Sequence, residues 1–133
     1  TNKNLAYFSF SLFNGYSHEY FYIPESYDLY LKETIEMFEN KGYLDDTLFI
    51  LMSDHGARLN YYAREIQQGR EERNHPFISL RLPKKLRHTE YFTNAKQNEK
   101  KLISHFDLYK TLRHIEYMIK NEKLIDSNDK KTN

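Results

Sequence analysis

Residues 47–56, which read TLFILMSDHG, constrain the fold of this chain more than any other stretch. Leu48 to Met52 form a continuous apolar run, short enough for a strand that is covered on both faces. Asp54 and His55 follow after Ser53. A carboxylate and an imidazole are costly to leave unpaired beside a buried strand. Because open α/β sheets bind ligands where their strands end, we expect a ligand site here.

The residues before this stretch predict a strand followed by a helix. Residues 5–13 are rich in aromatic residues and partly alternate, which indicates a strand. A helix is expected from Ser26, a candidate N-cap, to Lys41, with Gly42 as its left-handed cap. Strand, helix and strand in this order form a crossover unit, so the two strands are predicted to be parallel.

The residues after Gly56 alternate between polar connections and two further elements. Residues 57–73 are dense in charge and predict a long ordered loop with room for one helical turn. Residues 77–82 alternate as a strand does, and residues 84–98 predict a short helix and a loop. A helix is expected to about Lys120, with Asp107 as its N-cap or in its first turn. Residues 121–133 form a polar tail.

Composition excludes several classes of function. The chain has 133 residues, 39% hydrophobic and 29% charged, which indicates one globular domain. Its net charge of +1 gives no indication of nucleic acid as a partner, and the absence of cysteine excludes thiolate chemistry in this segment. No apolar run is long enough to cross a bilayer, and no P-loop, nucleophile elbow or dinucleotide motif is present. Since the first residue is Thr1, we expect a fragment that begins inside a larger domain.

Asp54 and His55 are the candidate metal ligands. Oxygen and imidazole donors suit Zn²⁺, Mn²⁺ and similar divalent ions. Neighbouring side chains on a strand point apart, but a turn at Gly56 could bring both to one side. The alternative is that the two side chains pair with each other and cap the next segment.

His18 and Arg58 are the candidate substrate-binding residues. His18 lies in the loop after the first predicted strand, which opens at the same sheet edge as Asp54 if the strands are parallel. The alternative places it as a packed histidine among the tyrosines Tyr16, Tyr20 and Tyr22. Arg58 could hold a sulfate or phosphate group through paired hydrogen bonds. The alternative for Arg58 is a salt bridge with one of the glutamates Glu71 and Glu72.

The other histidines have simpler explanations. Each lies at an element boundary, in a basic stretch or on a polar helix face, so surface positions are expected for His75, His88, His105 and His114.

The motifs resemble those of the sulfatase and alkaline-phosphatase superfamily. In that superfamily the strand that here ends in SDHG, preceded by a helix and GYLDD at residues 42–46, delivers an Asp and a His to the metal. The sequence is most similar to an uncharacterised animal branch of sulfatase-like proteins, a domain of unknown function. The branch shares SDHGAR at residues 53–58, then Arg64, Gly69, Glu72 and Pro76 in order, LRLP at 80–83, and FDLYKTL at 106–112.

This resemblance implies a fold, a cofactor and an activity. The fold is α/β, a layered sandwich with a mixed, largely parallel sheet, and residues 1–120 would be the C-terminal part of an alkaline-phosphatase-like domain. The activity is hydrolysis of a sulfate or phosphate ester of a small molecule, glycan or lipid, through a covalent intermediate. Asp54 and His55 would bind the divalent ion, which could be Zn, Mn, Ca or Mg, and His18 falls in a loop that contacts substrate or metal in related enzymes. Related enzymes often act outside the cell or on membranes.

One departure from the superfamily matters. The nucleophile and the first metal-binding acid of the superfamily precede the region that matches this chain, so no catalytic nucleophile is expected in this segment. We therefore expect the missing N-terminal part of the same domain as a partner, and an inactive isolated chain. Two alternatives stay open: a non-catalytic relative that acts as a binding or structural module, and a structural α/β piece in which Asp54 and His55 only pair with each other.

Overall fold

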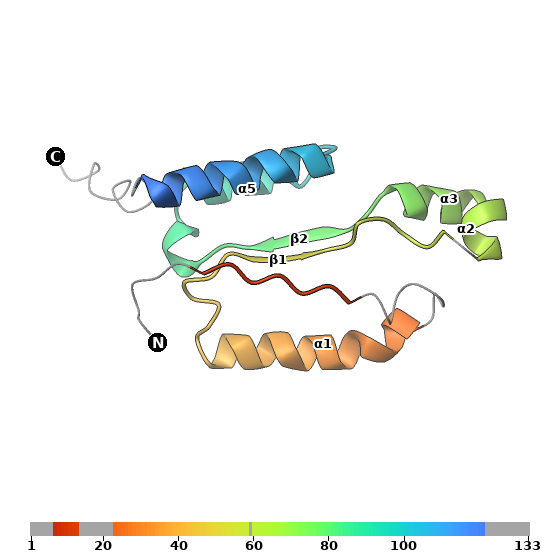
Figure 1. The fold of residues 1–133 in the computed structure, drawn as a ribbon, viewed down its shortest axis with the longest axis horizontal. Helices are drawn as coiled ribbons and strands as arrows, with labels where there is room; N and C mark the ends of the chain where they lie inside the picture. The colour runs from red at the N-terminus through yellow and green to blue at the C-terminus, as the bar shows by residue number, and fades with distance from the viewer. Residues whose placement is uncertain (1–6, 14–22, 59, 122–133) are drawn as a thin grey trace. The chain divides into compact units, whose positions relative to one another are not determined.

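The computed structural model describes residues 7–13, 23–58 and 60–121. The chain divides into two compact units, residues 1–87 and 88–133. The first contains α1, the strands β1 and β2, the short helices α2 and α3, and the 3₁₀ turn η1; the second contains α4 and α5. Figure 1 shows these elements in chain order.

Helix α1 spans Ile23–Asn40 and ends in a Schellman motif. Gly42 has φ 71°, its amide donates to the Glu39 carbonyl at 2.9 Å, and the Tyr43 amide donates to the Phe38 carbonyl at 2.9 Å. The rings of Tyr43 and Phe38, 6.1 Å apart, make the hydrophobic contact that accompanies this motif. The left-handed cap predicted at Gly42 is confirmed, whereas Ser26 is not the N-cap, because the helix already begins at Ile23.

The sheet of the described chain consists of β1 (Phe49–Met52) and β2 (Ile78–Arg81). The two strands are antiparallel, with Phe49 opposite Arg81 and Met52 opposite Ile78. Both strands lie where the apolar run and the alternating pattern predicted them. Figure 1 shows them side by side.

The predicted fold class is wrong for the described chain, which is mostly helical and has one two-stranded antiparallel sheet in place of a layered, largely parallel sandwich. Residues 7–13, the described part of the predicted first strand, belong to neither β1 nor β2, and their exposed side chains include Phe8 at 82%. Among the described residues β1 pairs with β2, which follows it in the sequence, and the predicted parallel crossover is not formed. The order of elements in the sequence predicted a parallel partner for β1, but the hydrogen bonds of β1 go to the antiparallel strand β2.

Two helices lie in the stretch 57–73, which was predicted as a long ordered loop with room for one helical turn. Helix α2 spans Tyr61–Glu65 and helix α3 spans Gln67–Asn74. The Asn60 side chain caps α2 by accepting a hydrogen bond from the Ala63 amide at 2.8 Å. Figure 1 shows the two helices together at one end of the β1–β2 pair. The many charged residues of this stretch lie on solvent-exposed helix faces. Their helical structure agrees with intrinsic propensity, because Gln, Arg and Glu all favour helices.

The core of the described residues is small. Leu44 and Ala63 are its fully buried hydrophobic side chains, at 2% and 1% exposure. Arg81 ties β2 to the α1–β1 connection: one Nη donates to the Leu44 carbonyl, and the other contacts Glu39 Oε1 at 2.9 Å. η1 (Lys84–Leu86) follows, and the Lys84 amide donates to the Asp45 carbonyl at 2.8 Å. These bonds hold one end of the strand pair, where Phe49 lies opposite Arg81, to the residues at and just after the end of α1.

In the second unit, α4 spans Glu90–Asn98 and α5 spans His105–Lys120. Ser104 is the N-cap of α5, and its hydroxyl and the Asp107 carboxylate form a reciprocal capping box. The prediction that Asp107 lies in the first turn is confirmed, and the N-cap is Ser104. Within the described residues, no helix has both the length and the apolar character that a membrane crossing requires.

Candidate functional site

The end of β1 is closed by a pair of hydrogen bonds between Ser53 and Phe77. The Ser53 amide donates to the Phe77 carbonyl at 2.9 Å, and the Phe77 amide donates to Ser53 Oγ at 2.9 Å. The serine side chain therefore occupies the place of the next backbone acceptor, and regular pairing stops there. Asp54 is the first residue beyond this closure.

Asp54 and His55 converge on the same side of the chain. His55 Nε2 lies 3.4 Å from Asp54 Oδ2, and the other carboxylate oxygen, Oδ1, accepts a hydrogen bond from the His55 amide at 2.9 Å. The Asp54 side chain is 82% exposed and that of His55 is 34% exposed, so an ion from solvent can reach the pair. Both side chains are oriented by contacts within residues 54–56.

The His55 ring is fixed by its other nitrogen. Nδ1 lies 2.6 Å from the Gly56 carbonyl oxygen, and because a carbonyl can only accept, Nδ1 carries the proton. In a neutral ring the lone pair is then on Nε2, the atom that faces Asp54. This is the arrangement found in metal-binding histidines, whose second nitrogen commonly donates to a carbonyl or carboxylate. A protonated ring would instead make a direct ion pair with Asp54.

Gly56 is required by close packing. Its φ lies outside the left-handed region, so the special backbone angle that was predicted for it is wrong. A Cβ at this position would lie 2.5 Å from the Glu72 carbonyl oxygen and 2.8 Å from Arg73 Cα. The Gly56 amide donates to the Arg73 carbonyl at 3.1 Å. The loop that carries Asp54 and His55 is therefore fastened to the backbone of α3.

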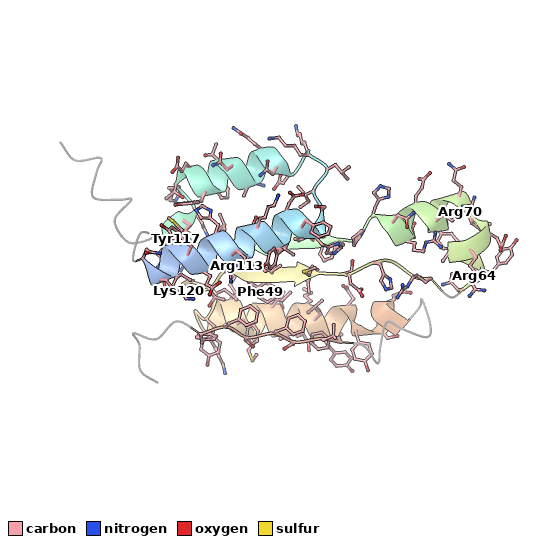
Figure 2. All side chains as sticks on the ribbon, turned by 45° about the horizontal axis from the view of Figure 1, so that its top comes forward. Phe49, Arg64, Arg70, Arg113, Tyr117 and Lys120 are labelled. Atoms are coloured by element: carbon pink, nitrogen blue, oxygen red, sulfur yellow. The ribbon has the colours of Figure 1, made fainter. Side chains whose placement is uncertain are left out.

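Beyond this loop, contacts from a side chain to a backbone carbonyl link three exposed arginines, Arg58, Arg64 and Arg70. Arg64 Nε donates to the Arg58 carbonyl at 3.5 Å, and Arg70 Nη1 donates to the Arg64 carbonyl at 2.9 Å. Figure 2 labels Arg64 on α2 and Arg70 on α3. Among the residues that the structure describes, none of these three guanidinium groups lies within ion-pair distance of a carboxylate. We call Arg58, Arg64 and Arg70 the arginine cluster.

The nearby glutamates bind neutral donors instead. Glu72 Oε1 accepts hydrogen bonds from the Tyr62 hydroxyl and from Gln68 Nε2, each at 3.0 Å, and Glu71 Oε1 accepts one from Gln67 Nε2 at 3.0 Å. Burial, and then the hydrogen bond and the negative charge of Glu72, raise the pKa of Tyr62. The alternative of a salt bridge from Arg58 to Glu71 or Glu72 is therefore absent from the described structure.

The packing of α2 on α3 fixes the arginine cluster. Gly69 approaches α2 so closely that a Cβ would lie 2.1 Å from the Tyr62 carbonyl oxygen. Ala63 of α2 is buried, and the Arg70 amide donates to the Ile66 carbonyl at 3.1 Å. Arg64 and Arg70 therefore project from two helices whose backbones are in direct contact.

The remaining candidates are elsewhere or outside the description. His18 lies outside the described residues, as do residues 122–133 of the expected tail. His75 follows α3 as its C-cap, and its Nδ1 lies 2.7 Å from the Glu71 carbonyl oxygen. His88, His105 and His114 are exposed, as expected. Across the described ranges, no group of three or more His, Cys, Asp or Glu side chains could hold a metal.

Arg64 and Arg70 were not among the candidate binding residues predicted from the sequence. The available signal was their spacing, because Arg58, Arg64 and Arg70 are each six residues apart. That regularity becomes informative only once a helix break at Ile66 is known, since it places Arg64 and Arg70 on different helices.

Comparison with known proteins defines the family of this chain. The sequence model of a family described as a protein of unknown function, DUF229, matches residues 1–133. The chain therefore belongs to the DUF229 family. No curated protein and no solved structure matches it.

Proposed function

We propose that this DUF229 chain contributes two metal ligands, Asp54 and His55, to a sulfatase-like, metal-dependent hydrolase of sulfate or phosphate esters. The observation that carries the proposal is the geometry of the pair. Two donors about 2.1 Å from one tetrahedral ion lie about 3.4 Å apart. The Nε2–Oδ2 distance is 3.4 Å, and Nδ1 is already engaged by the Gly56 carbonyl.

The chemistry of the pair suits a divalent ion. One carboxylate oxygen and one neutral imidazole nitrogen fit Zn²⁺ or Mn²⁺, and Mg²⁺ or Ca²⁺ would require more oxygen donors. A bound ion would stabilise negative charge on the transferred sulfate or phosphate group. The part played by this chain is to hold Nε2 and Oδ2 on one side of a closed strand end, with Gly56 packed on α3.

The remaining ligands and the nucleophile would come from another part of the same protein, which would complete the domain. The exposed apolar side chains of residues 7–13 support this, among them Phe8 at 82% and Phe10 at 72%. Exposed large apolar side chains that gather on one segment are typical of an interface. The substrate would be a small-molecule, glycan or lipid ester.

The test is the metal content and activity of the full-length protein. We would measure bound Zn and Mn by mass spectrometry, and hydrolysis of an aryl sulfate and an aryl phosphate, for the wild type, Asp54→Asn and His55→Ala. The proposal requires bound metal in the wild type and its loss in both variants. His75→Ala is the matched control, because the His75 ring also contacts a backbone carbonyl but lies in no ion pair with a carboxylate in the described structure.

A second candidate function follows from the same pair of residues. If Asp54 and His55 form only an ion pair at 3.4 Å, the chain would be a non-catalytic relative that keeps the fold as a binding module. A full-length protein that purifies without metal, with a stability in chelator that is the same for the wild type and Asp54→Asn, would establish this alternative and end the hydrolase proposal.

A further inference from the structure

We propose that the arginine cluster binds a second sulfate or phosphate group of the substrate, beside the group held at the metal. The inference rests on the proposed function and narrows the substrate to esters that carry at least two such anionic groups. It begins from three exposed guanidinium groups that have no carboxylate partner within the described residues.

The arginine cluster carries three positive charges, and the hydrogen bonds of the Arg64 and Arg70 side chains go to backbone carbonyls, which carry no net charge. Such charges attract an oxyanion. Glu71 and Glu72 are close in sequence but hydrogen-bond to Gln67, Gln68 and Tyr62. In the described structure these two glutamates therefore form no ion pair with the arginine cluster.

The guanidinium groups of the arginine cluster have hydrogen-bond donors to spare. A guanidinium has five N–H donors in a planar fork that matches the oxygens of sulfate and phosphate. Arg64 uses one contact on the Arg58 carbonyl, and Arg70 uses one on the Arg64 carbonyl. These contacts hold the Arg64 and Arg70 side chains in place, and their remaining N–H groups can donate to an oxyanion.

The arginine cluster is connected to Asp54 and His55 by a short stretch of chain and by a backbone contact. Arg58 is three residues from His55, so an extended chain separates their Cα atoms by at most about 11 Å. Gly56 fastens the loop between them to Arg73 of α3, the helix that also carries Arg70. Backbone packing therefore holds the loop that carries the candidate metal ligands to the helix that carries Arg70, and we expect a substrate with two anionic groups to span the two places.

The binding experiment isolates the cluster from the metal. The full-length His55→Ala protein, treated with chelator, is titrated with inorganic sulfate and with inorganic phosphate by calorimetry. In this background Arg64→Gln and Arg70→Gln should each weaken anion binding by about tenfold, because a charge-assisted hydrogen bond is lost. Arg64→Lys keeps the positive charge but loses the planar fork of donors. Its anion affinity should lie between those of the wild-type arginine and Arg64→Gln.

The control is Arg113→Gln on α5, which removes the same charge from an arginine that pairs with Glu116 at 2.9 Å. It should leave anion binding unchanged. Equal weakening by Arg113→Gln and Arg64→Gln would show a general charge effect and overturn the inference, and so would unchanged binding in both Arg64→Gln and Arg70→Gln.

The turnover experiment uses an aryl monosulfate and the disulfate of the same ring, with wild-type metal content. Arg64→Gln and Arg70→Gln should raise KM for the disulfate by about tenfold and leave the monosulfate within about twofold. Equal effects on both substrates would contradict a second anion site. The calorimetry is done without metal, so its result can be interpreted even if the protein is not a hydrolase. The metal analysis does not involve Arg64 or Arg70, so it can be interpreted even if the arginine cluster binds no anion.

Discussion

The amide of Gly56 donates a hydrogen bond to the carbonyl of Arg73, at 3.1 Å. This contact joins the loop after β1 to the helix that precedes β2. It leaves no space for a side chain at residue 56, because a Cβ there would lie 2.5 Å from the Glu72 carbonyl oxygen. The glycine after Asp54 and His55 therefore serves the packing of two chain segments, and the candidate metal ligands depend on it.

Gly56→Ala should lower the free energy of unfolding by about 1–3 kcal/mol, because the backbone of α3 or of the loop must move to admit a methyl group. The same movement should displace His55 and weaken metal binding in the full-length protein. Urea denaturation and metal titration measure the two effects. Gly42→Ala is the control: it should cost about 1–2 kcal/mol through its positive φ, with metal affinity unchanged. A Gly56→Ala protein as stable as the wild type would contradict the packing account.

His55→Ala should abolish ester hydrolysis in the full-length protein with little loss of stability. The His55 side chain is 34% exposed, and within the described residues its ring hydrogen-bonds to the neighbouring Gly56 carbonyl, so its removal leaves a space open to solvent in place of a closed core cavity. Thermal unfolding and turnover of an aryl sulfate or aryl phosphate measure the result. Retention of wild-type turnover would count against His55 as a ligand.

Arg81→Met should destabilise the fold by about 1–3 kcal/mol, because the Leu44 carbonyl loses its charged donor in the most buried part of the described structure. Glu39→Gln, which removes only the exposed ion pair of Arg81, should cost less than about 1 kcal/mol. Urea denaturation of both variants separates the hydrogen bond from the ion pair. Equal costs would show that the ion pair, and not the Leu44 contact, holds β2 to the end of α1.

The capping box of α5 should make that helix sensitive to acid. Hydrogen bonds from the Ser104 hydroxyl and amide hold the pKa of Asp107 below its ordinary value of 3.8. A carboxyl whose folded pKa is lowered contributes stability above its unfolded pKa and loses it as pH falls through the folded pKa. The stability difference between wild type and Asp107→Asn should therefore be full at pH 6 and shrink below about pH 4. Urea denaturation at pH 6 and pH 3 measures it, and a difference independent of pH would exclude the carboxylate as the cause.

Local signals in the sequence were reliable where one or two neighbouring residues decide the structure. Gly42 ends α1, Asp107 lies in the first turn of α5, and the apolar run and the alternating run form β1 and β2, as predicted. Each of these depends on backbone angles or hydrogen bonds within a few residues. The loop predicted for residues 57–73 allowed one helical turn, whereas two helices form. Helix α3 was missed because its sequence, QQGREERN, gives no apolar periodicity.

Strand pairing could not be read from the sequence. A parallel partner for β1 was predicted in residues 5–13, and the ladder forms with residues 78–81 instead. Pairing depends on contacts between distant segments, which element order constrains only weakly. The position of Asp54 at a strand end was nevertheless correct, because it required only that β1 stop at Met52. The arginine cluster needed three-dimensional contacts between two helices, and Arg58 alone was identified beforehand.

The double hydrogen bond between Ser53 and Phe77 sets a tight limit on changes in chain length. Side chains alternate along β2, so a single-residue deletion between residues 77 and 82 would reverse its phase relative to β1. Arg81 would then turn away from Leu44 while Phe77 lost its place opposite Ser53. Natural variants of this segment should therefore preserve its number of residues even where they alter its composition, whereas residues 99–103, which connect α4 to α5, can change in number without shifting any strand.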